Sequence, residues 1–356
     1  MNMNFVVLNS SKKWGGNERW VTTAVNGLAT RGHKIYLIVR QNARHWKKIH
    51  SSVNIVEAPY TNELSIKTKS IIKRILNNNI DIMLSTKRKD YIIAAQIKYS
   101  NKIKHIMRLG ISRPILKRDF IQRYVLKHMV DGIIVNAEAL KSELLKYDFM
   151  KQNFDSNKIK CIYNGYDITE KPKEEIPNKT YSFIVRSAGR LTAHKGYDML
   201  IESLKNFTTD YCLEIAGEGP EYSALDDLIN QYGLQNKCKL VGVRNNTINF
   251  FAGADLIVIP SRSEGIPNTL FEAWSAKKPV ITTNVGGVPE VVDHKKDGII
   301  CEPNVDSIHS AINDFFQEKN IYKDLGKNGY QKLNRNFSMK HMIDELENYF
   351  DSFNDC

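Results

Sequence analysis

Two glutamates, Glu264 and Glu272, are the strongest candidates for chemistry in this sequence. They lie eight residues apart, between an apolar segment and a helical pattern. Between them lies the run Gly265, Ile266, Pro267, Asn268 and Thr269. All of these residues except Pro267 have a backbone N–H group, and such groups at a helix start bind anions and hydroxyl groups. Both carboxylates can face one ligand rich in hydroxyls, such as a sugar or a ribose. A bare pair of glutamates is more often structural.

Cations and glycines mark the loops after other apolar segments. Arg190 and Lys195 stand five residues apart in a glycine-flanked loop, where two cations can bind a diphosphate. Glycines at Gly217–Gly219 and Gly286–Gly287 permit a close approach of the backbone to a ligand. Solvated charged loops, or turns without a ligand, explain these runs equally well.

The pair Gly15-Gly16 follows the first apolar run and opens a helical pattern. Backbone N–H groups and the helix dipole favour an anion at such a place. A tight structural turn explains the pair equally well.

Apolar runs alternate with helical patterns along the whole chain, which is typical of βα units in a parallel sheet. A first series of strands is expected at 5–9, 34–39, 53–56, 80–85, 105–108, 132–136 and 159–163, and a second at 181–188, 211–216, 238–241, 256–260 and 279–282. A polar run with prolines, 169–180, is the expected linker. The sequence therefore predicts α/β architecture with domains at 1–168 and 181–337, and an amphipathic helix at about 338–356.

Composition excludes several classes of protein. The chain has 356 residues, 42% of them apolar and 25% charged, which excludes disorder and low complexity. No apolar run approaches the ~20 residues that span a bilayer, and the first residues do not form a signal peptide. The expected location is the cytoplasm. Five cysteines form no Cys-x-x-Cys pair, so we expect reduced thiols and no zinc site.

The net charge of +12 is unevenly distributed. Residues 1–170 have 30 Lys and Arg against 13 Asp and Glu, whereas residues 171–356 have 21 against 26. We expect the basic half to meet an anionic partner. The stretches 67–76 and 113–127 combine cations with apolar residues at helical spacing, which suits either a membrane surface or an ordinary half-buried helix. A nucleic-acid partner is disfavoured, because no helix-turn-helix, zinc or exposed aromatic pattern accompanies the charge.

Together these motifs resemble glycosyltransferase family 4. The matching runs keep the family's order and spacing: Gly189-Arg190-Leu191 with Lys195-Gly196, Gly217-Glu218-Gly219-Pro220, Glu264 to Glu272, and Gly286-Gly287-Val288-Pro289-Glu290. Looser similarities are Gly15 to Arg19 and Asn164 to Asp167. The resemblance implies the GT-B fold, in which two Rossmann-like domains face each other across a cleft. The first domain would bind the acceptor, the second the donor, and the last helix would cross back to the first domain.

The resemblance also implies an activity: retaining transfer of a hexosyl or N-acetylhexosaminyl group from a nucleotide sugar, such as a UDP- or GDP-sugar. The acceptor would be a saccharide or a lipid-linked saccharide, in the assembly of capsule, O-antigen or exopolysaccharide at the inner membrane face. Arg190 and Lys195 would bind the diphosphate, Glu272 the ribose and Glu264 the transferred sugar. The rest of the expected donor-binding set is Gly15, Gly16, Gly217, Glu218, Gly265, Ile266, Pro267, Asn268 and Thr269.

Two features refine this hypothesis. The chain has no Asp-x-Asp, the run that holds a divalent metal in transferases of the other large fold, so we expect no metal or other cofactor. Many members place a histidine after the strand near residue 105, but here His105 opens the strand and Arg108 stands nearer its carboxyl end. Arg108 is therefore the expected catalytic group facing the cleft. The alternatives are a nucleotide-sugar epimerase of the same fold and a basic protein that binds nucleic acid or membrane without catalysis.

Overall fold

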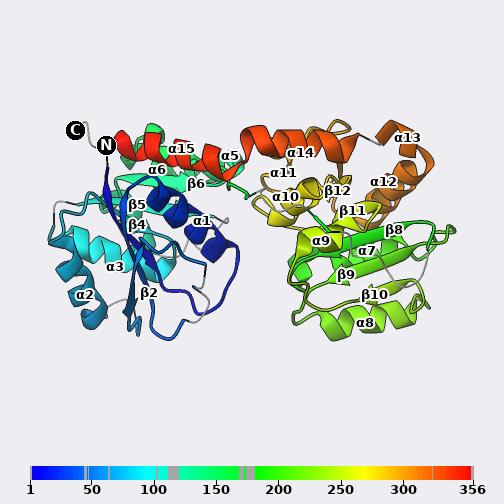
Figure 1. The fold of residues 1–356 in the computed structure, drawn as a ribbon, viewed down its shortest axis with the longest axis horizontal. Helices are drawn as coiled ribbons and strands as arrows, with labels where there is room; N and C mark the ends of the chain where they lie inside the picture. The colour runs from blue at the N-terminus through cyan, green and yellow to red at the C-terminus, as the bar shows by residue number, and fades with distance from the viewer. Residues whose placement is uncertain are drawn as a thin grey trace. The chain divides into compact units, whose positions relative to one another are not determined.

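Two compact units make up the protein. The computed structural model describes residues 2–43, 46, 48–62, 65–101, 103–110, 120–167, 172–173, 181–322 and 324–353. Unit 1 comprises Met1–Gly165 and Met339–Cys356, and unit 2 comprises Tyr166–Ser338 (Figure 1). The chain passes from one unit to the other at Gly165 and Tyr166. Most of the expected linker, 169–180, lies outside the described residues.

Unit 1 is built on a seven-stranded parallel sheet with the order β3-β2-β1-β4-β5-β6-β7. Its strands are β1 (Asn4–Asn9), β2 (Lys34–Arg40), β3 (Asn54–Ala58), β4 (Ile82–Ser85), β5 (Lys104–Leu109), β6 (Gly132–Val135) and β7 (Ile159–Cys161). Most of these strands are continuous apolar runs buried on both faces, as parallel strands covered by helices must be. The sequence predicts all seven strands, and the predicted ends lie within two residues of the observed ends.

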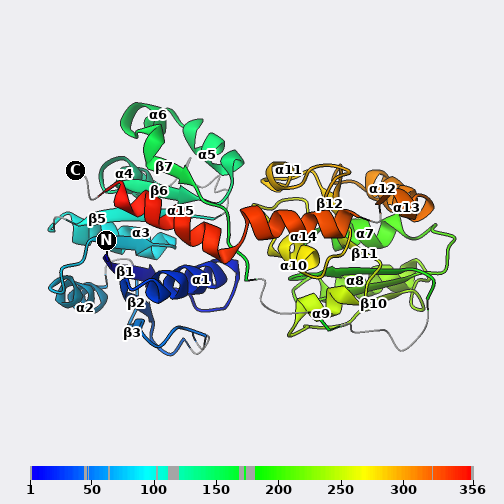
Figure 2. The same cartoon turned by 45° about the horizontal axis from the view of Figure 1, so that its top comes forward.

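The helices of unit 1 include the last helix of the chain. They are α1 (Gly16–Thr30), α2 (Ile66–Leu76), α3 (Arg88–Lys98), α4 (Phe120–His128), α5 (Glu138–Leu145), α6 (Asp148–Asn153) and α15 (Met339–Asp351). Helix α15 lies along α1 (Figure 2), and a Cβ at Gly27 would stand 2.4 Å from Ile343. Met342, Leu346 and Phe350 of α15 are buried in the same apolar cluster as Phe5 of β1. The amphipathic tail therefore returns to the first domain, as expected.

Unit 2 is built on a six-stranded parallel sheet with the order β10-β9-β8-β11-β12-β13. Its strands are β8 (Ile184–Ala188), β9 (Cys212–Ala216), β10 (Cys238–Leu240), β11 (Leu256–Ile259), β12 (Val280–Thr283) and β13 (Ile299–Cys301). Its helices are α7 (Tyr197–Ser203), α8 (Tyr222–Gln231), α9 (Thr247–Ala252), α10 (Asn268–Ser275), α11 (Val288–Val291), α12 (Val305–Gln317), α13 (Lys319–Tyr322) and α14 (Leu325–Asn336). Strand β13 is short, and the sequence did not predict it.

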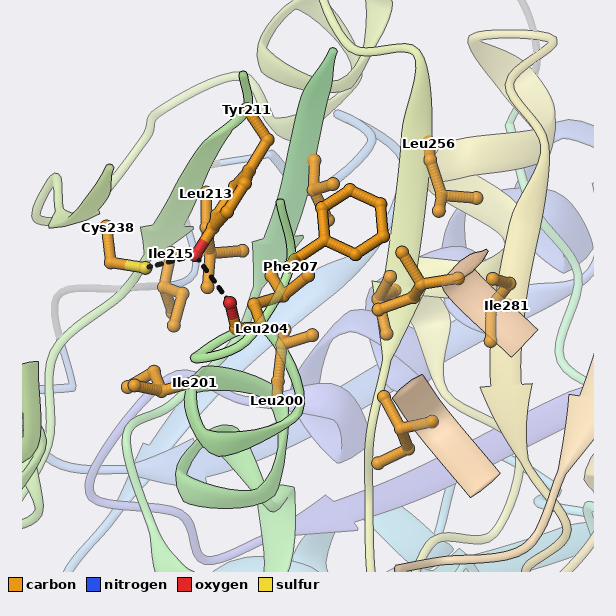
Figure 3. Close-up of a cluster of buried hydrophobic side chains, with 14 of the residues drawn as sticks. Leu200, Ile201, Leu204, Phe207, Tyr211, Leu213, Ile215, Cys238, Leu256 and Ile281 are labelled. Carbon is orange, nitrogen blue, oxygen red and sulfur yellow. Dashed lines mark hydrogen bonds between the residues drawn. The ribbon is translucent and has the colours of Figure 1, made fainter. Parts of the chain in front are cut away.

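One part of the core of unit 2 lies between its sheet and α7. Leu200 of α7 and Leu204, which directly follows this helix, pack in the same cluster as Leu213 of β9, and Tyr211 lies beside them (Figure 3). The hydroxyl group of Tyr211 donates a hydrogen bond of 2.9 Å to the carbonyl of Leu204, which satisfies the polar end of a ring that is otherwise buried in apolar surroundings.

Both sheets reverse their strand order beside their first strand. In unit 1 the reversal lies between β1 and β4, and in unit 2 between β8 and β11. Ligands of open α/β sheets bind at the carboxyl ends of the strands, at such a reversal. The topology therefore directs attention to the loops after β1 and β4, and to those after β8 and β11. Among the described helices, none has the length and apolarity needed to cross a membrane.

Candidate functional site

The loops at the reversal in unit 2 place a cation against a carboxylate. Lys195, which ends the β8–α7 loop, forms an ion pair with Oε1 of Glu264 in the β11–α10 loop. The hydroxyl group of Ser261 donates a 3.1 Å hydrogen bond to the same oxygen. The two charged side chains are 19% and 14% exposed, so the pair is largely shielded from water yet reachable. Two residues that the sequence assigned to one ligand are thus direct partners.

Arg262 fixes the position of the loop that carries Lys195. Its backbone N–H donates to the carbonyl of His194 at 2.7 Å, and its Nη1 donates to the carbonyl of Ala193 at 2.9 Å. The guanidinium also makes a bidentate pair with Asp198, at 2.7 and 2.5 Å. Partial burial would raise the pKa of Asp198, but the hydrogen bonds and charge of Arg262 lower it below its usual value. Sequence reasoning missed this contact, because nothing local to Arg262 indicates its partner 64 residues away.

Glycines allow the remaining loops to pack against these two. Gly217 has φ +149°, and a Cβ there would stand 1.9 Å from the carbonyl oxygen of Gly189. Gly286 has φ +56°, and a Cβ there would stand 1.6 Å from the carbonyl oxygen of Glu264. No other residue fits such contacts. Both glycines therefore have a structural role, because they allow the loops after β8, β9, β11 and β12 to pack together.

Backbone hydrogen bonds join the same loops into one edge. Leu191 N–H donates to Glu218 at 2.9 Å, and Gly287 N–H donates to Gly265 at 2.7 Å. Gly217 N–H donates at 2.9 Å to Gly242, in the β10–α9 loop. The glycine run at 286–287 therefore joins the candidate site, which the sequence left open. The β10–α9 loop also joins it and was missed, although its place after a strand could have indicated it.

Helix α10 begins in the middle of this edge without a side-chain cap. Its N-cap residue is Pro267, which makes no side-chain hydrogen bond to the first turn. Ile266 and Pro267 are buried, whereas Gly265, Asn268 and Thr269 are partly exposed. Open N–H groups at a helix start favour an anion or a hydroxyl oxygen. Asn268 and Thr269 have their N–H groups at this helix start.

The other predicted residues of unit 2 differ in exposure. Arg190 and Glu218 are exposed, and the Arg190 guanidinium makes no ion pair with any residue that the structure describes. Glu272 lies one turn inside α10 and is only 5% exposed. Tyr197, which the sequence did not indicate, lies beneath the loop edge, and its burial and the charge of Glu264 raise its pKa. In the described part of the chain, no three His, Cys, Asp or Glu side chains are grouped to hold a metal ion.

Unit 1 has its own polar edge at the reversal between β1 and β4. Gly15 and Gly16 are exposed, and α1 begins there without a side-chain cap. Glu18 in the first turn is buried and pairs with Lys87 of the β4–α3 loop at 2.8 Å. Burial would raise the pKa of Glu18, but Lys87 lowers it. Asp90 accepts hydrogen bonds of 3.1 and 3.3 Å from the backbone N–H of Ser10, so buried acids hold the glycine loop in place.

Arg108 does not face an open surface, contrary to expectation. It stands near the carboxyl end of β5 as predicted, but it is only 4% exposed because its guanidinium lies over the Trp20 ring at 4.6 Å. Nη1 donates to Asn17 at 2.7 Å and Nη2 to Asn164 at 3.2 Å. Burial lowers the pKa of Arg108 to about 10. Through the first of these hydrogen bonds, Arg108 holds Asn17 in the first turn of α1.

His105 has a structural environment. It is fully buried and its Nε2 lies 2.7 Å from the hydroxyl group of Ser85, while Nδ1 lies 2.8 Å from the carbonyl of Met129. A neutral ring that donates from Nδ1 and accepts at Nε2 satisfies both contacts. Burial lowers the pKa of His105 to about 4.

The sequence of this chain is similar to those of known glycosyltransferases. Residues 167–332 match the family model described as glycosyl transferases group 1. The lipopolysaccharide core biosynthesis glycosyltransferase LpsD of Rhizobium meliloti is 25% identical over 95% of each chain.

Solved structures agree along nearly the whole length. A glycosyltransferase from Rickettsia africae has a TM-score of 0.82 at 20% identity and covers 99% of this chain and 98% of its own. Anabaena HepE, in complex with UDP, has a TM-score of 0.82 at 17% identity and covers 98% and 100%. The predicted pair of Rossmann-like domains is confirmed. The chain therefore has the GT-B fold, and its residues 167–332 are similar to the glycosyl transferases group 1 family.

Proposed function

We propose that this glycosyltransferase moves a hexosyl or N-acetylhexosaminyl group from a nucleotide sugar to a saccharide or a lipid-linked saccharide, in the assembly of a bacterial surface polysaccharide. One observation carries the proposal. Lys195, Glu264 and the uncapped start of α10 meet at the strand-order reversal of unit 2. A cation and helix N–H groups suit a diphosphate, and a carboxylate suits the hydroxyl groups of a sugar.

The donor would be held by its charges and hydroxyl groups. Arg190 and Lys195 would bind the diphosphate and neutralise the charge that grows as it leaves. Gly265, Ile266, Asn268 and Thr269 would donate N–H groups, with Pro267 between them as the residue that starts the helix. Gly217 and Glu218 would border the nucleotide, and Glu272 would accept from the ribose. UDP is the first nucleotide to try, because the similar Anabaena chain binds it. Two protein cations would then do the work of a metal, so we expect activity in excess chelator; loss of activity with EDTA that Mg²⁺ restores would refute this.

The transfer would retain the anomeric configuration. The bond between the anomeric carbon and the diphosphate oxygen breaks, and the acceptor oxygen bonds to the same face of that carbon. The acceptor proton passes to the leaving phosphate. Double displacement would instead need a carboxylate as nucleophile. A covalent sugar adduct trapped on Glu264 would overturn the front-face route.

Unit 1 would supply the acceptor side. Its glycine loop, Gly15-Gly16, stands at the other strand-order reversal, and Arg108 positions that loop through Asn17. Unit 1 has 31 Lys and Arg against 16 Asp and Glu, a net charge of +15. Such a surface favours an acceptor that carries phosphate, as lipid-linked saccharides do.

Binding and hydrolysis of a panel of nucleotide sugars test the proposal. Wild type should bind one donor saturably, and Glu272→Ala should weaken that binding. Asp227→Ala, which removes an exposed carboxylate of α8, is the control and should bind as wild type does. No binding of any donor would refute the proposal. Conversion of the donor to an isomeric nucleotide sugar, without an acceptor, would favour an epimerase instead.

A further inference from the structure

The loop after β1 presents a tryptophan and two lysines to solvent. Trp14 is 45% exposed, and Lys12 and Lys13 beside it are exposed as well. The Trp14 ring stands edge-on to the buried Trp46, with the ring centroids 6.3 Å apart and the ring planes at 77°. This contact supports the Trp14 ring, while nearly half of the side chain stays open to solvent. A large aromatic side chain is therefore held at the carboxyl end of β1, where ligands of such sheets bind.

A second group of cations lies at the start of α3. Lys87 is the N-cap residue of this helix, Arg88 and Lys89 are its first two residues, and all three are partly exposed. The partial positive charge at a helix N-terminus disfavours cations there. Helix α2 shows the favourable arrangement, with Lys73 and Arg74 in its last turn. The cations at the start of α3 therefore cost stability unless an anion neutralises them.

Hydrogen bonds connect the two groups of cations. Nζ of Lys87 donates to Oγ of Ser11 at 3.0 Å and pairs with Glu18 at 2.8 Å. The Ser11 hydroxyl group in turn donates to the carbonyl of Lys13 at 2.7 Å. The ammonium group of Lys87 thus lies within hydrogen-bond reach of the loop that carries Lys12, Lys13 and Trp14.

The acidic side chains of this edge are covered. Glu18 is 2% exposed and Asp90 is fully buried, where it accepts hydrogen bonds from the backbone N–H of Ser10. Burial raises the pKa of Asp90 to about 6. The charge that the two loops offer to a ligand is therefore positive.

A sugar that carries a phosphate matches both features of this edge. An aromatic ring packs against the C–H face of a pyranose, which leaves the sugar hydroxyl groups free to form hydrogen bonds. Lysine ammonium groups bind phosphate oxygens through charge-assisted hydrogen bonds. A nucleic-acid strand would need several aromatic platforms along a groove, whereas Trp14 is the one exposed aromatic residue in the described loops after β1 and β4.

We propose that Trp14, Lys12, Lys13 and Lys87 form a subsite for the phosphate-bearing sugar of the acceptor. The pyranose ring lies on Trp14, and the three lysines contact the phosphate attached to that sugar. This inference rests on the proposed transferase function and deepens it, because it names a glycosyl phosphate or diphosphate as the acceptor class. A neutral sugar contacts the ring alone and a free phosphate contacts the lysines alone, so each binds more weakly.

Quenching of tryptophan fluorescence by acrylamide tests the platform, because Trp20, Trp46 and Trp274 are at most 8% exposed. At least one of glucose 1-phosphate, galactose 1-phosphate and N-acetylglucosamine 1-phosphate should protect Trp14 saturably, and less so as salt rises. Inorganic phosphate should not protect it, and the matching methyl glycoside should need about tenfold higher concentration or more. No protection by any of the three sugar phosphates at low salt would overturn the subsite. Equal protection by inorganic phosphate would overturn the role of Trp14.

Variants separate the ring from the charges, with the affinity for the sugar phosphate measured by calorimetric titration. Trp14→Ala should lower the affinity about tenfold and Trp14→Phe should retain most of it, whereas Tyr99→Ala, which removes another exposed aromatic residue of unit 1, should have no effect. Lys12→Gln with Lys13→Gln should lower the affinity about tenfold or more. Lys73→Gln with Arg74→Gln is the matched pair on α2 and should not. Equal losses in the control variants would overturn the subsite.

Binding of UDP distinguishes this subsite from the donor site. UDP affinity should be the same in wild type and in all these variants. Loss of UDP binding in Lys12→Gln with Lys13→Gln would assign these cations to the donor and overturn the inference. Sugar-phosphate binding by a protein that binds no nucleotide sugar would count against the proposed transferase function, whereas donor binding without sugar-phosphate binding would count against this subsite alone.

Discussion

The ion pair between Lys195 and Glu264 makes a prediction that separates donor binding from catalysis. Without a ligand, the two side chains neutralise each other. A diphosphate that binds Lys195 must compete with the Glu264 carboxylate for the same ammonium group. Glu264→Gln keeps the size of the side chain and removes the competing charge. The variant should therefore bind a nucleoside diphosphate more tightly than wild type, while it loses transfer.

The structure sets the size of the effect. Both side chains are mostly shielded from water, at 19% and 14% exposed, so the pair is stronger than a surface ion pair. A hydrogen bond to a charged group contributes about 1.5–3 kcal/mol, and the amide retains part of it. We expect nucleoside diphosphate affinity to rise by about 1 kcal/mol, or about fivefold. Transfer should fall about a hundredfold or more, as when a charge-stabilising group is lost.

Calorimetric titration with the nucleoside diphosphate of the identified donor measures the first quantity, and product formation measures the second. Ser261→Ala is the control, because it removes a hydrogen bond to Glu264 but keeps the charge. It should change diphosphate affinity less than Glu264→Gln does. Lys195→Ala should weaken binding. Weaker diphosphate binding by Glu264→Gln would refute the reasoning, since it would mean that the carboxylate supports the diphosphate instead of competing with it.

Three further predictions concern the elements around the site. Gly286→Ala should lower the free energy of unfolding by about 2 kcal/mol or more, measured by urea denaturation, because its Cβ would stand 1.6 Å from the Glu264 carbonyl oxygen. The control is Gly242→Ala, where φ is +70° and an added Cβ meets no atom within 4 Å, so that it should cost only about 1 kcal/mol. Equal losses in the two variants would contradict the contact at Gly286. His105 has a pKa of about 4 in the folded protein and 6.5 as a free side chain, so the unfolded state binds more protons between these pH values. The free energy of unfolding should therefore fall as the pH falls through this window, by about 2 kcal/mol at pH 5. His105→Gln should lose this dependence of stability on pH, and an unchanged dependence would exclude His105 as its source. Arg262→Ala should raise the KM for the donor about tenfold, with little loss of overall stability because the pair with Asp198 is half-exposed. The double variant Arg262→Asp with Asp198→Arg exchanges the two charges and should bring the KM part of the way back toward wild type. No recovery would mean that this pair does not hold the loop after β11 against the start of α7.

Much of the fold follows from local patterns in the sequence. Apolar runs separated by helical patterns predict parallel α/β domains, because buried parallel strands and amphipathic helices each have a local signature. Local patterns also indicated the candidate loops. Gly, Arg, Lys and Glu at the carboxyl ends of strands stand where open α/β sheets bind ligands. Glu264 and Lys195 could therefore be proposed before their contact was known.

Which side chains meet, and which are covered, depends on contacts between segments that are distant in the sequence. Arg108 has the sequence position of a ligand-facing residue, yet Trp20 and Asn164 enclose it from segments far away in the chain. Arg262, in the loop after β11, forms its ion pair with Asp198 in the first turn of α7. Helices α2 and α4 have similar basic and apolar patterns, but packing buries Ile72 and Ile75 of α2 and leaves Phe120, Ile121 and Tyr124 of α4 exposed. Burial depends on neighbours that are distant in sequence, and no local pattern specifies them.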